Sequence, residues 1–186
     1  MTGSRPQLRR PPMPPCELYV VRHAIAAERG PEWPDDDIRP LTEKGIARFK
    51  DGLAGLTSLD VALDEIFTSP LVRAKQTADL LAADIAGKPP VKLLPALAPG
   101  HGPDEVMTQL ARAAKRRRIA LVGHEPGLGE LAAHLLGAKR PLAFRKGGVC
   151  RIDLQGLTGK RPGSLGWFVT PKMLRQIGKA GTRSKE

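Results

Sequence analysis

Cysteine and aromatic residues are scarce in this chain of 186 residues, which contains two cysteines and 4% aromatic residues. Cys16 and Cys150 are too few for a disulfide framework, and no Cys-x-x-Cys pair is present for metal binding or redox chemistry. So few aromatic rings offer few platforms on which bases can stack, and we therefore expect no specific nucleic-acid binding.

Long apolar runs are absent as well. No stretch approaches the roughly 20 apolar residues of a membrane span. The first fifteen residues are rich in proline and arginine and lack the apolar segment of about 7–15 residues that a secretory signal contains. We therefore expect a cytoplasmic protein with no membrane partner.

Positive charge exceeds negative charge by 11, and much of the excess lies at the two ends. Residues 1–15 carry a net charge of +3 and residues 171–186 carry +4, which leaves +4 for the rest of the chain. This modest remainder favours an anionic substrate over a nucleic acid. The composition predicts a disordered arm over residues 1–15, a single domain over residues 16–172 and a basic tail over residues 173–186.

Short apolar runs alternate with amphipathic helical patterns along the chain. The runs are typical of buried strands, and the patterns between them have helical spacing. Strands are predicted at residues 17–23, 65–70, 91–94, 118–124, 149–154 and 165–170, and helices after Thr42, from Pro70, at 105–114 and at 127–136. This alternation predicts an α/β fold, a three-layer sandwich with a mostly parallel central sheet and helices on both faces.

Residues suited to phosphoryl chemistry follow three of these strands. Arg22 and His23 end the first strand, and Arg73 lies on the first turn of the helix from Pro70. His124 ends a later strand, with Glu125 directly after it. Because the carboxyl ends of parallel strands meet at one crevice, we expect these residues to lie close together. Arginines bind phosphate oxygens bidentately and a neutral imidazole can attack phosphorus, so the set predicts a phosphoryl site.

Two other uses of these residues fit the sequence less well. Cys16 and Arg22 have the Cys-x5-Arg spacing of thiolate phosphatases, but the residues between them have a strand pattern without glycine and cannot wrap an anion. His23 and His124 have no third ligand at a spacing that zinc sites use. We therefore expect neither a metal nor a cofactor.

These residues lie in motifs that resemble the histidine phosphatase (phosphoglycerate-mutase-like) superfamily. The matching segments are Val21-Arg22-His23-Ala24, Leu41-Thr42-x-x-Gly45, Thr68-Ser69-Pro70-x-x-Arg73-Ala74-x-Gln76-Thr77-Ala78 and Val122-Gly123-His124-x-Pro126. The small size of the chain and two further segments resemble the SixA-type phosphohistidine phosphatases. Those segments are Arg39-Pro40-Leu41-Thr42 and Trp167…Pro171…Leu174.

The resemblance implies a role for each matching residue. His23 would be the nucleophile that forms a phosphohistidine intermediate, Arg22 and Arg73 would bind the phosphoryl oxygens, and His124 would also contact the phosphoryl group. We expect the neighbouring guanidinium groups to lower the pKa of His23 and keep it neutral for attack. We expect His124 to serve best in its protonated form, as a hydrogen-bond donor to developing charge.

Enzymes of this superfamily also use an acid that protonates the leaving group. Residues 94–98 lack the glutamate that mutases and many phosphatases of the superfamily carry there. Glu125 occupies the place of the aspartate that acid phosphatases of the superfamily use, and we hypothesise that it assists leaving-group protonation. The missing glutamate favours a substrate that needs little acid assistance, such as phosphohistidine on a protein.

Two classes of function remain. The first is a phosphatase acting on a phosphohistidine-bearing protein, with a small phosphate ester as the alternative substrate. The second is a catalytically weak module that uses the same crevice to bind phosphate. The sequence leaves the phosphorylated partner and the oligomeric state open.

Overall fold

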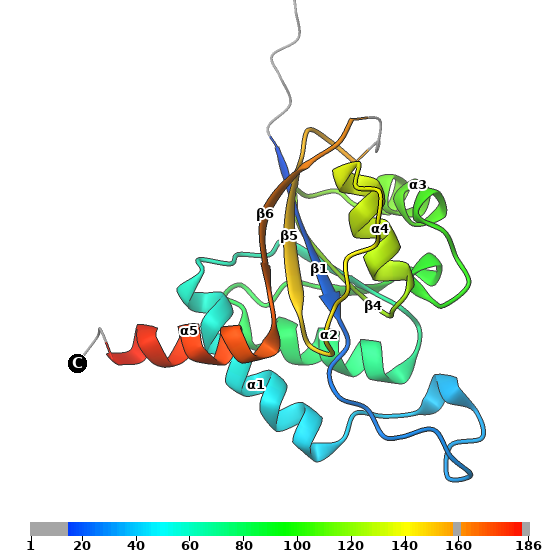
Figure 1. Ribbon diagram of the computed structural model, residues 1–186, viewed down its shortest axis with the longest axis vertical. Coiled ribbons are helices and arrows are strands. Elements are labelled where there is room, and N and C mark those ends of the chain that lie inside the picture. The colour runs from blue at the N-terminus through cyan, green and yellow to red at the C-terminus, as the bar shows by residue number, and fades with distance from the viewer. Residues whose placement is uncertain (1–14, 158–160, 184–186) are drawn as a thin grey trace, which may run out of the picture.

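A computed structural model describes residues 15–157 and 161–183, and its centre is a six-stranded mixed sheet (Figure 1). The strands follow the order β3-β2-β4-β1-β5-β6. The first four pair in parallel, and β5 and β6 extend the sheet antiparallel. Their bounds are β1 Cys16–Arg22, β2 Glu65–Thr68, β3 Val91–Leu93, β4 Arg118–Gly123, β5 Val149–Leu154 and β6 Ser164–Val169. The mostly parallel sheet predicted from the sequence is confirmed.

Helices cover both faces of this sheet. On one face lie α1 (Glu43–Ser58), α2 (Val72–Asp84) and α5 (Pro171–Arg183), and on the other lie α3 (Pro103–Ala113) and α4 (Gly127–Leu136). Two short 3-10 helices, Asp36–Ile38 and Pro95–Leu97, interrupt the connections. The predicted three-layer α/β sandwich is therefore confirmed.

Strand β1 shows how the sequence produces these layers. Successive side chains of a strand point to opposite faces, so an unbroken apolar run buries both faces at once. Leu18 and Val20 pack into the core beneath α3 and α4, whereas Tyr19 and Val21 pack into the core beneath α1, α2 and α5. Because both of its faces are covered, β1 takes a central place in the sheet.

The helices begin near the residues that the sequence marks. Thr42 caps α1 as predicted, since its hydroxyl accepts a hydrogen bond from the Gly45 amide at 2.9 Å. Helix α2 begins at Val72, so Pro70 precedes the helix instead of lying in its first turn. Arg73 still lies on the first turn, at the end nearest the sheet crevice.

The predicted ends of the domain need one correction. The basic tail expected from residue 173 is, up to Arg183, part of helix α5, which packs along α1. Leu174 is buried there, and a Cβ on Gly55 would lie 2.2 Å from its carbonyl oxygen, so only glycine allows this close helix contact. The arm predicted at residues 1–15 lies, apart from Pro15, outside the described residues. Over the described ranges, none of the helices has the length and apolar character needed to cross a membrane.

Candidate active site

The two predicted histidines lie side by side at the carboxyl ends of β1 and β4. These strands pair in parallel with Arg22 opposite Gly123, and the His23 amide donates to the Gly123 carbonyl at 3.1 Å. The centres of the imidazole rings of His23 and His124 are 5.0 Å apart. Both side chains are buried, at 5% and 6% exposure. The register of two neighbouring strands therefore builds the centre of the site.

A cavity of about 330 Å³ opens above these rings, and we call it the histidine cavity. It is lined by Arg22, His23, Ala27, Glu28, Arg29, Arg39, Arg73, His124 and Lys146. The structure thus brings together four of the five residues predicted for the site and leaves Glu125 out of the lining. Five of the lining residues are arginine or lysine, which makes the cavity strongly attractive to anions.

His23 presents a free ring nitrogen to this cavity. Its Nδ1 lies 2.7 Å from the Ala24 carbonyl oxygen, a partner that can only accept, so the proton of the neutral ring is on Nδ1 and Nε2 keeps its lone pair. Burial lowers the pKa of His23 to about 4, and the charges of Arg73, Arg22 and Lys146 contribute to the shift. At neutral pH the imidazole is therefore uncharged, the state that the sequence analysis expects for a nucleophile.

His124 is neutral as well, which differs from the protonated state expected from the sequence. Burial lowers its pKa to about 3, and the adjacent His23 and the arginines act in the same direction. Its Nε2 lies 2.9 Å from the Ser69 hydroxyl, which itself accepts a hydrogen bond from the Leu71 amide. Ser69 can thus donate its proton to Nε2, and in that tautomer the proton of neutral His124 is on Nδ1. A neutral His124 then still offers an N–H donor.

The two arginines are held by the backbone while part of each guanidinium stays unpaired. Arg22 donates from Nη1 to the Phe144 carbonyl at 2.5 Å, and Arg73 donates from Nη1 to the Asp36 carbonyl at 2.6 Å. The Nε atoms of both arginines are buried without a hydrogen-bond partner. Burial lowers the pKa of each guanidinium from its ordinary value. The protein therefore orients both side chains before any ligand arrives.

Asp36 is a functional residue that the sequence analysis missed. Its carboxylate pairs with Arg73 at 2.8 Å, and with Arg39 and Arg29 at 2.9 Å each. Burial alone would raise the pKa of Asp36, but the hydrogen bonds from Arg29 and Arg39 and the charge of Arg73 hold it well below its usual range. One carboxylate thus fixes three arginines around the cavity, and it connects the loop over residues 26–39 to α2.

Residues of the matching motifs without a predicted role also support the site. The Thr77 hydroxyl accepts from the Ala24 amide at 3.0 Å and donates to the Arg73 carbonyl at 2.7 Å. The Gln76 side chain accepts from the Leu41 amide at 2.7 Å. Helix α2 is therefore joined to both the segment after His23 and the segment before α1.

Both carboxylate oxygens of Glu125, the residue hypothesised from the sequence to assist leaving-group protonation, accept hydrogen bonds from backbone amides. Its Oε1 accepts from the Phe144 amide at 2.6 Å, and its Oε2 accepts from the Gly129 amide at 3.2 Å. The carboxylate thereby joins the first turn of α4 to the loop whose Phe144 carbonyl holds Arg22. In the part of the chain that the structure describes, Glu28 is the carboxylate that lines the histidine cavity.

Fold and site together define an α/β protein with a cationic crevice built around two neutral histidines. Comparison with known proteins narrows this class. Residues 18–99 match the model of the histidine phosphatase superfamily (branch 1). The chain is 38% identical over 151 residues to an uncharacterized protein from Picosynechococcus sp., an alignment that covers 80% of this chain and 86% of the relative.

Two further matches concern SixA. The chain is 24% identical over 162 residues to the phosphohistidine phosphatase SixA of Escherichia coli, covering 86% of this chain and 96% of SixA. A solved structure of the protein histidine phosphatase SixA complexed with tungstate matches with a TM-score of 0.74 and 24% identity, over 85% of this chain and 99% of that one. The chain belongs to the histidine phosphatase superfamily, and this membership supports phosphatase activity.

Proposed function

We propose that this protein hydrolyses phosphohistidine on a partner protein through a covalent phosphohistidine intermediate at His23. The observation that carries the proposal is a set of unpaired polar atoms. Over residues 15–157 and 161–183, the buried side-chain nitrogen and oxygen atoms without a hydrogen-bond partner are Arg22 Nε, Arg73 Nε and His124 Nδ1. Buried polar atoms are normally satisfied, so three of them around one cavity favour a ligand rich in oxygen acceptors.

A phosphoryl group satisfies these atoms. Its oxygens would accept from the two guanidinium groups and from the Nδ1–H of neutral His124, while its phosphorus would face Nε2 of His23. In the first step a bond forms between Nε2 and phosphorus, and the bond from phosphorus to the substrate breaks. In the second step water attacks the phosphorus, the bond to Nε2 breaks, inorganic phosphate leaves and the proton lost from water passes to solvent.

The leaving group favours phosphohistidine as the substrate. When the second ring nitrogen of a phosphorylated imidazole carries a proton, the ring leaves as a neutral molecule and takes no further proton during bond breaking. The alcohol part of a phosphate ester would leave as an alkoxide, and it therefore needs a general acid. Because both oxygens of Glu125 accept backbone amides, the site suits a leaving group that needs little assistance.

Rapid-quench kinetics tests the proposal. Wild type, His23→Ala and the exposed control His134→Ala would each be mixed with free phosphohistidine, with a phosphohistidine-bearing protein domain and with a panel of small phosphate esters. We expect phosphate release from both phosphohistidine substrates, through an acid-labile phosphoenzyme that His23→Ala lacks and His134→Ala retains. Turnover of esters alone would discard the phosphohistidine assignment, and no turnover at all would favour the phosphate-binding module.

A small phosphate ester remains a second candidate because Glu28 lines the cavity. Its carboxyl group could supply the proton that an alkoxide leaving group requires. Glu28→Gln should then slow ester turnover and leave phosphohistidine turnover unchanged. Equal rates with Glu28→Gln and wild type on every ester would remove Glu28 as the acid.

A further inference from the structure

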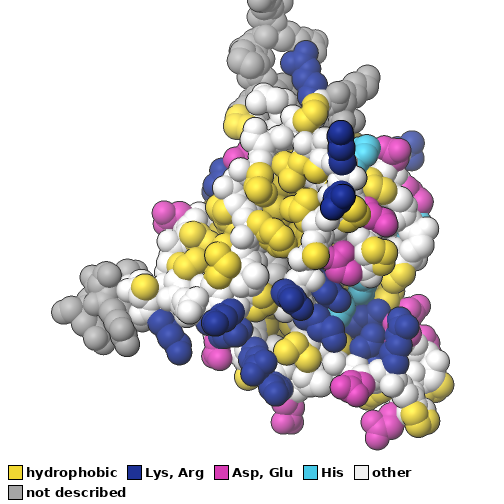
Figure 2. Space-filling view, viewed as in Figure 1, with side chains coloured by type: hydrophobic (Ala, Val, Ile, Leu, Met, Phe, Trp, Pro, Cys, Tyr) yellow, Lys and Arg dark blue, Asp and Glu magenta, His cyan; other side chains and the backbone are white. Residues whose placement is uncertain are grey.

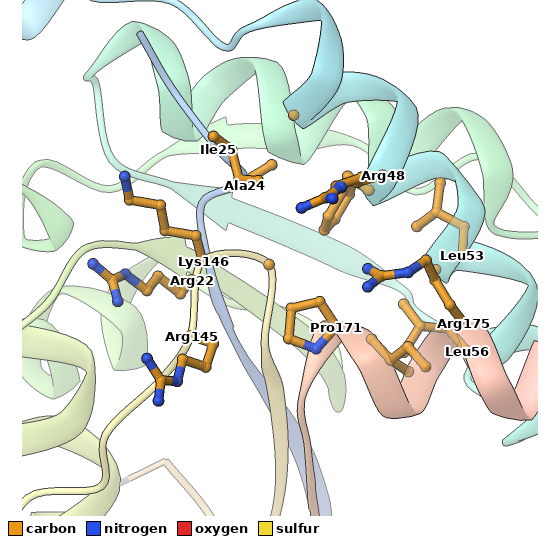
Figure 3. A pocket seen from close by; sticks show the side chains of 15 residues that line it. Arg22, Ala24, Ile25, Arg48, Leu53, Leu56, Arg145, Lys146, Pro171 and Arg175 are labelled. Atoms are coloured by element: carbon orange, nitrogen blue, oxygen red, sulfur yellow. The ribbon is translucent and has the colours of Figure 1, made fainter. Parts of the chain in front are cut away.

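A second cavity, of about 380 Å³, adjoins the histidine cavity between α1, α5 and residues 145–147 (Figure 3). We call it the α1–α5 cavity. It is lined by Arg22, Ala24, Ile25, Gly45, Arg48, Phe49, Gly52, Leu53, Leu56, Arg145, Lys146, Gly147, Pro171, Leu174 and Arg175. Arg22 and Lys146 line both cavities, so the two cavities lie next to each other.

The inner wall of this cavity consists of apolar side chains. Phe49, Leu53 and Leu56 reach it from α1, and Leu174 reaches it from α5. All four side chains are buried against the core beneath these helices. Gly52 also lines the cavity and has no side chain to fill it. Ligand cavities of this size are typically apolar with a few polar groups at the opening.

The opening of the cavity is positively charged. Arg48 comes from α1 and Arg175 from α5, while Arg145 and Lys146 lie across the cavity on the loop before β5 (Figure 3). No acidic residue of the described chain lines the cavity, and no described carboxylate forms an ion pair with these four cations. Basic side chains also cover this part of the surface around α1 and α5 in Figure 2. The charge is thus available to a ligand.

We propose that the α1–α5 cavity binds a small organic anion, with its apolar body against Phe49, Leu53, Leu56 and Leu174 and its acidic group among the cations at the opening. The apolar wall requires a carbon skeleton, because inorganic anions would leave it in water. The cationic opening selects a carboxylate, sulfonate or phosphate. A concave cavity of about 380 Å³ with an apolar wall suits a compact molecule.

Binding in this cavity should also be felt in the histidine cavity. The organic anion in the α1–α5 cavity and the phosphoryl group in the histidine cavity would both lie near Arg22 and Lys146. Because the two anions repel each other, each should lower the binding affinity of the other. This coupling is reciprocal by thermodynamic necessity. Because both cations are at or near the surface, we expect the mutual weakening to be less than about fivefold at physiological ionic strength.

The first test measures binding of 8-anilinonaphthalene-1-sulfonate by fluorescence and of 1-naphthoate by calorimetry to the full chain. Both probes join aromatic rings to one acidic group. We expect saturable 1:1 binding, weakened about fivefold by Arg48→Gln and by Arg175→Gln, because each removes one surface charge contact. Lys50→Gln and Lys172→Gln, exposed on the same two helices, are matched controls and should bind as wild type does.

A variant that fills the apolar space tests whether the probe needs that space when all the cations are kept. A Cβ on Gly52 would meet only the Leu174 Cβ, at 3.6 Å, so Gly52→Leu starts its side chain without a clash at a position that lines the cavity, and it keeps every cation. We expect this variant to lose at least about tenfold in probe affinity because its side chain occupies the apolar space. Its unfolding transition, compared with that of wild type, shows that the protein remains folded.

Three results would overturn the proposal: failure of both probes to bind wild type, equal affinity of wild type and Gly52→Leu, or complete competitive displacement of the probe by tungstate. The last result would place the probe in the histidine cavity instead. The proposal does not depend on the phosphohistidine assignment, since none of these measurements requires turnover.

Discussion

The histidine cavity and the α1–α5 cavity share Arg22 and Lys146, yet they differ in the kind of side chain that is buried in their walls. In the histidine cavity the polar groups at the centre, His23, Arg73 and His124, are buried, and Arg73 is exposed by only 3% and paired with Asp36. In the α1–α5 cavity the buried part is hydrocarbon, and the cations Arg48 and Arg145 are exposed.

This difference suits the histidine cavity to catalysis and the α1–α5 cavity to ligand binding. Fixed groups in a site of low dielectric constant stabilise developing charge without reorganising during the reaction. Exposed cations are mobile and screened by salt, so each contributes little on its own. We therefore expect substitutions of the buried residues in the histidine cavity to change turnover strongly, and conservative substitutions of residues that line only the α1–α5 cavity to leave turnover of a small substrate almost unchanged.

The sharpest form of this comparison exchanges arginine for lysine in each cavity. Arg73→Lys keeps the charge but loses the planar fork that binds both Asp36 and a phosphoryl group, and we expect kcat/KM for free phosphohistidine to fall about 10²- to 10³-fold. Arg48→Lys should change kcat/KM for free phosphohistidine by less than about threefold. Steady-state kinetics on both variants checks this, and equal effects would remove the distinction between the cavities.

Asp36→Asn tests whether the fixed geometry of the arginines matters apart from their charge. Without the carboxylate, Arg73 keeps only the Asp36 carbonyl as a partner, and Arg29 and Arg39 lose their shared anion. We expect kcat to fall about tenfold through misplacement of Arg73. KM for an anionic substrate should fall too, because the cavity becomes more positive. Asp36→Glu should restore part of kcat, whereas a rise in KM with unchanged kcat would contradict a positioning role.

The four residues at the centre of the site were predictable because the order of the parallel strands brings their carboxyl ends, and the helix that follows one of them, to the same edge of the sheet. Arg22, His23 and His124 end neighbouring parallel strands, and Arg73 begins the helix after the next strand in the sheet. Asp36 was not predictable in the same way. It lies in the run Asp35-Asp36-Asp37, where nothing in the sequence distinguishes the middle residue, and only the folded loop turns its carboxylate toward three arginines.

The C-terminal helix was missed for a different reason. Its net positive charge led to the expectation of a tail, although Leu174 and Ile177 recur at helical spacing. Two apolar residues are a weak signal by themselves, and the helix gains its stability from packing on α1, including the close approach at Gly55. The α1–α5 cavity was invisible to sequence analysis because it depends on this packing.

The two buried histidines should make the stability of the protein depend on pH. His23 and His124 have pKa values lowered to about 4 and about 3, so between pH 6.5 and pH 4 the unfolded chain binds more protons than the folded protein. The free energy of unfolding should therefore fall as the pH drops through this window, by up to about 1.4 kcal/mol per pH unit for each histidine. Urea unfolding between pH 5 and pH 6.5 should show a shallower slope for His23→Asn than for wild type, and an equal slope would contradict the lowered pKa of His23.

Glu125→Gln gives the smallest expected effect on turnover and decides between two roles for that residue. The amide keeps one acceptor oxygen but turns an NH2 group toward one of the two backbone N–H donors, at Gly129 or at Phe144. We expect the free energy of unfolding to fall by about 1–2 kcal/mol, while kcat on phosphohistidine changes by less than about twofold. A general acid would give the reverse pattern, because loss of its proton would abolish the basic limb of the pH–rate profile and leave stability unchanged. Since the Phe144 carbonyl holds Arg22, any loss of activity through structure alone should appear with every substrate alike, whereas a lost acid would slow esters far more than phosphohistidine.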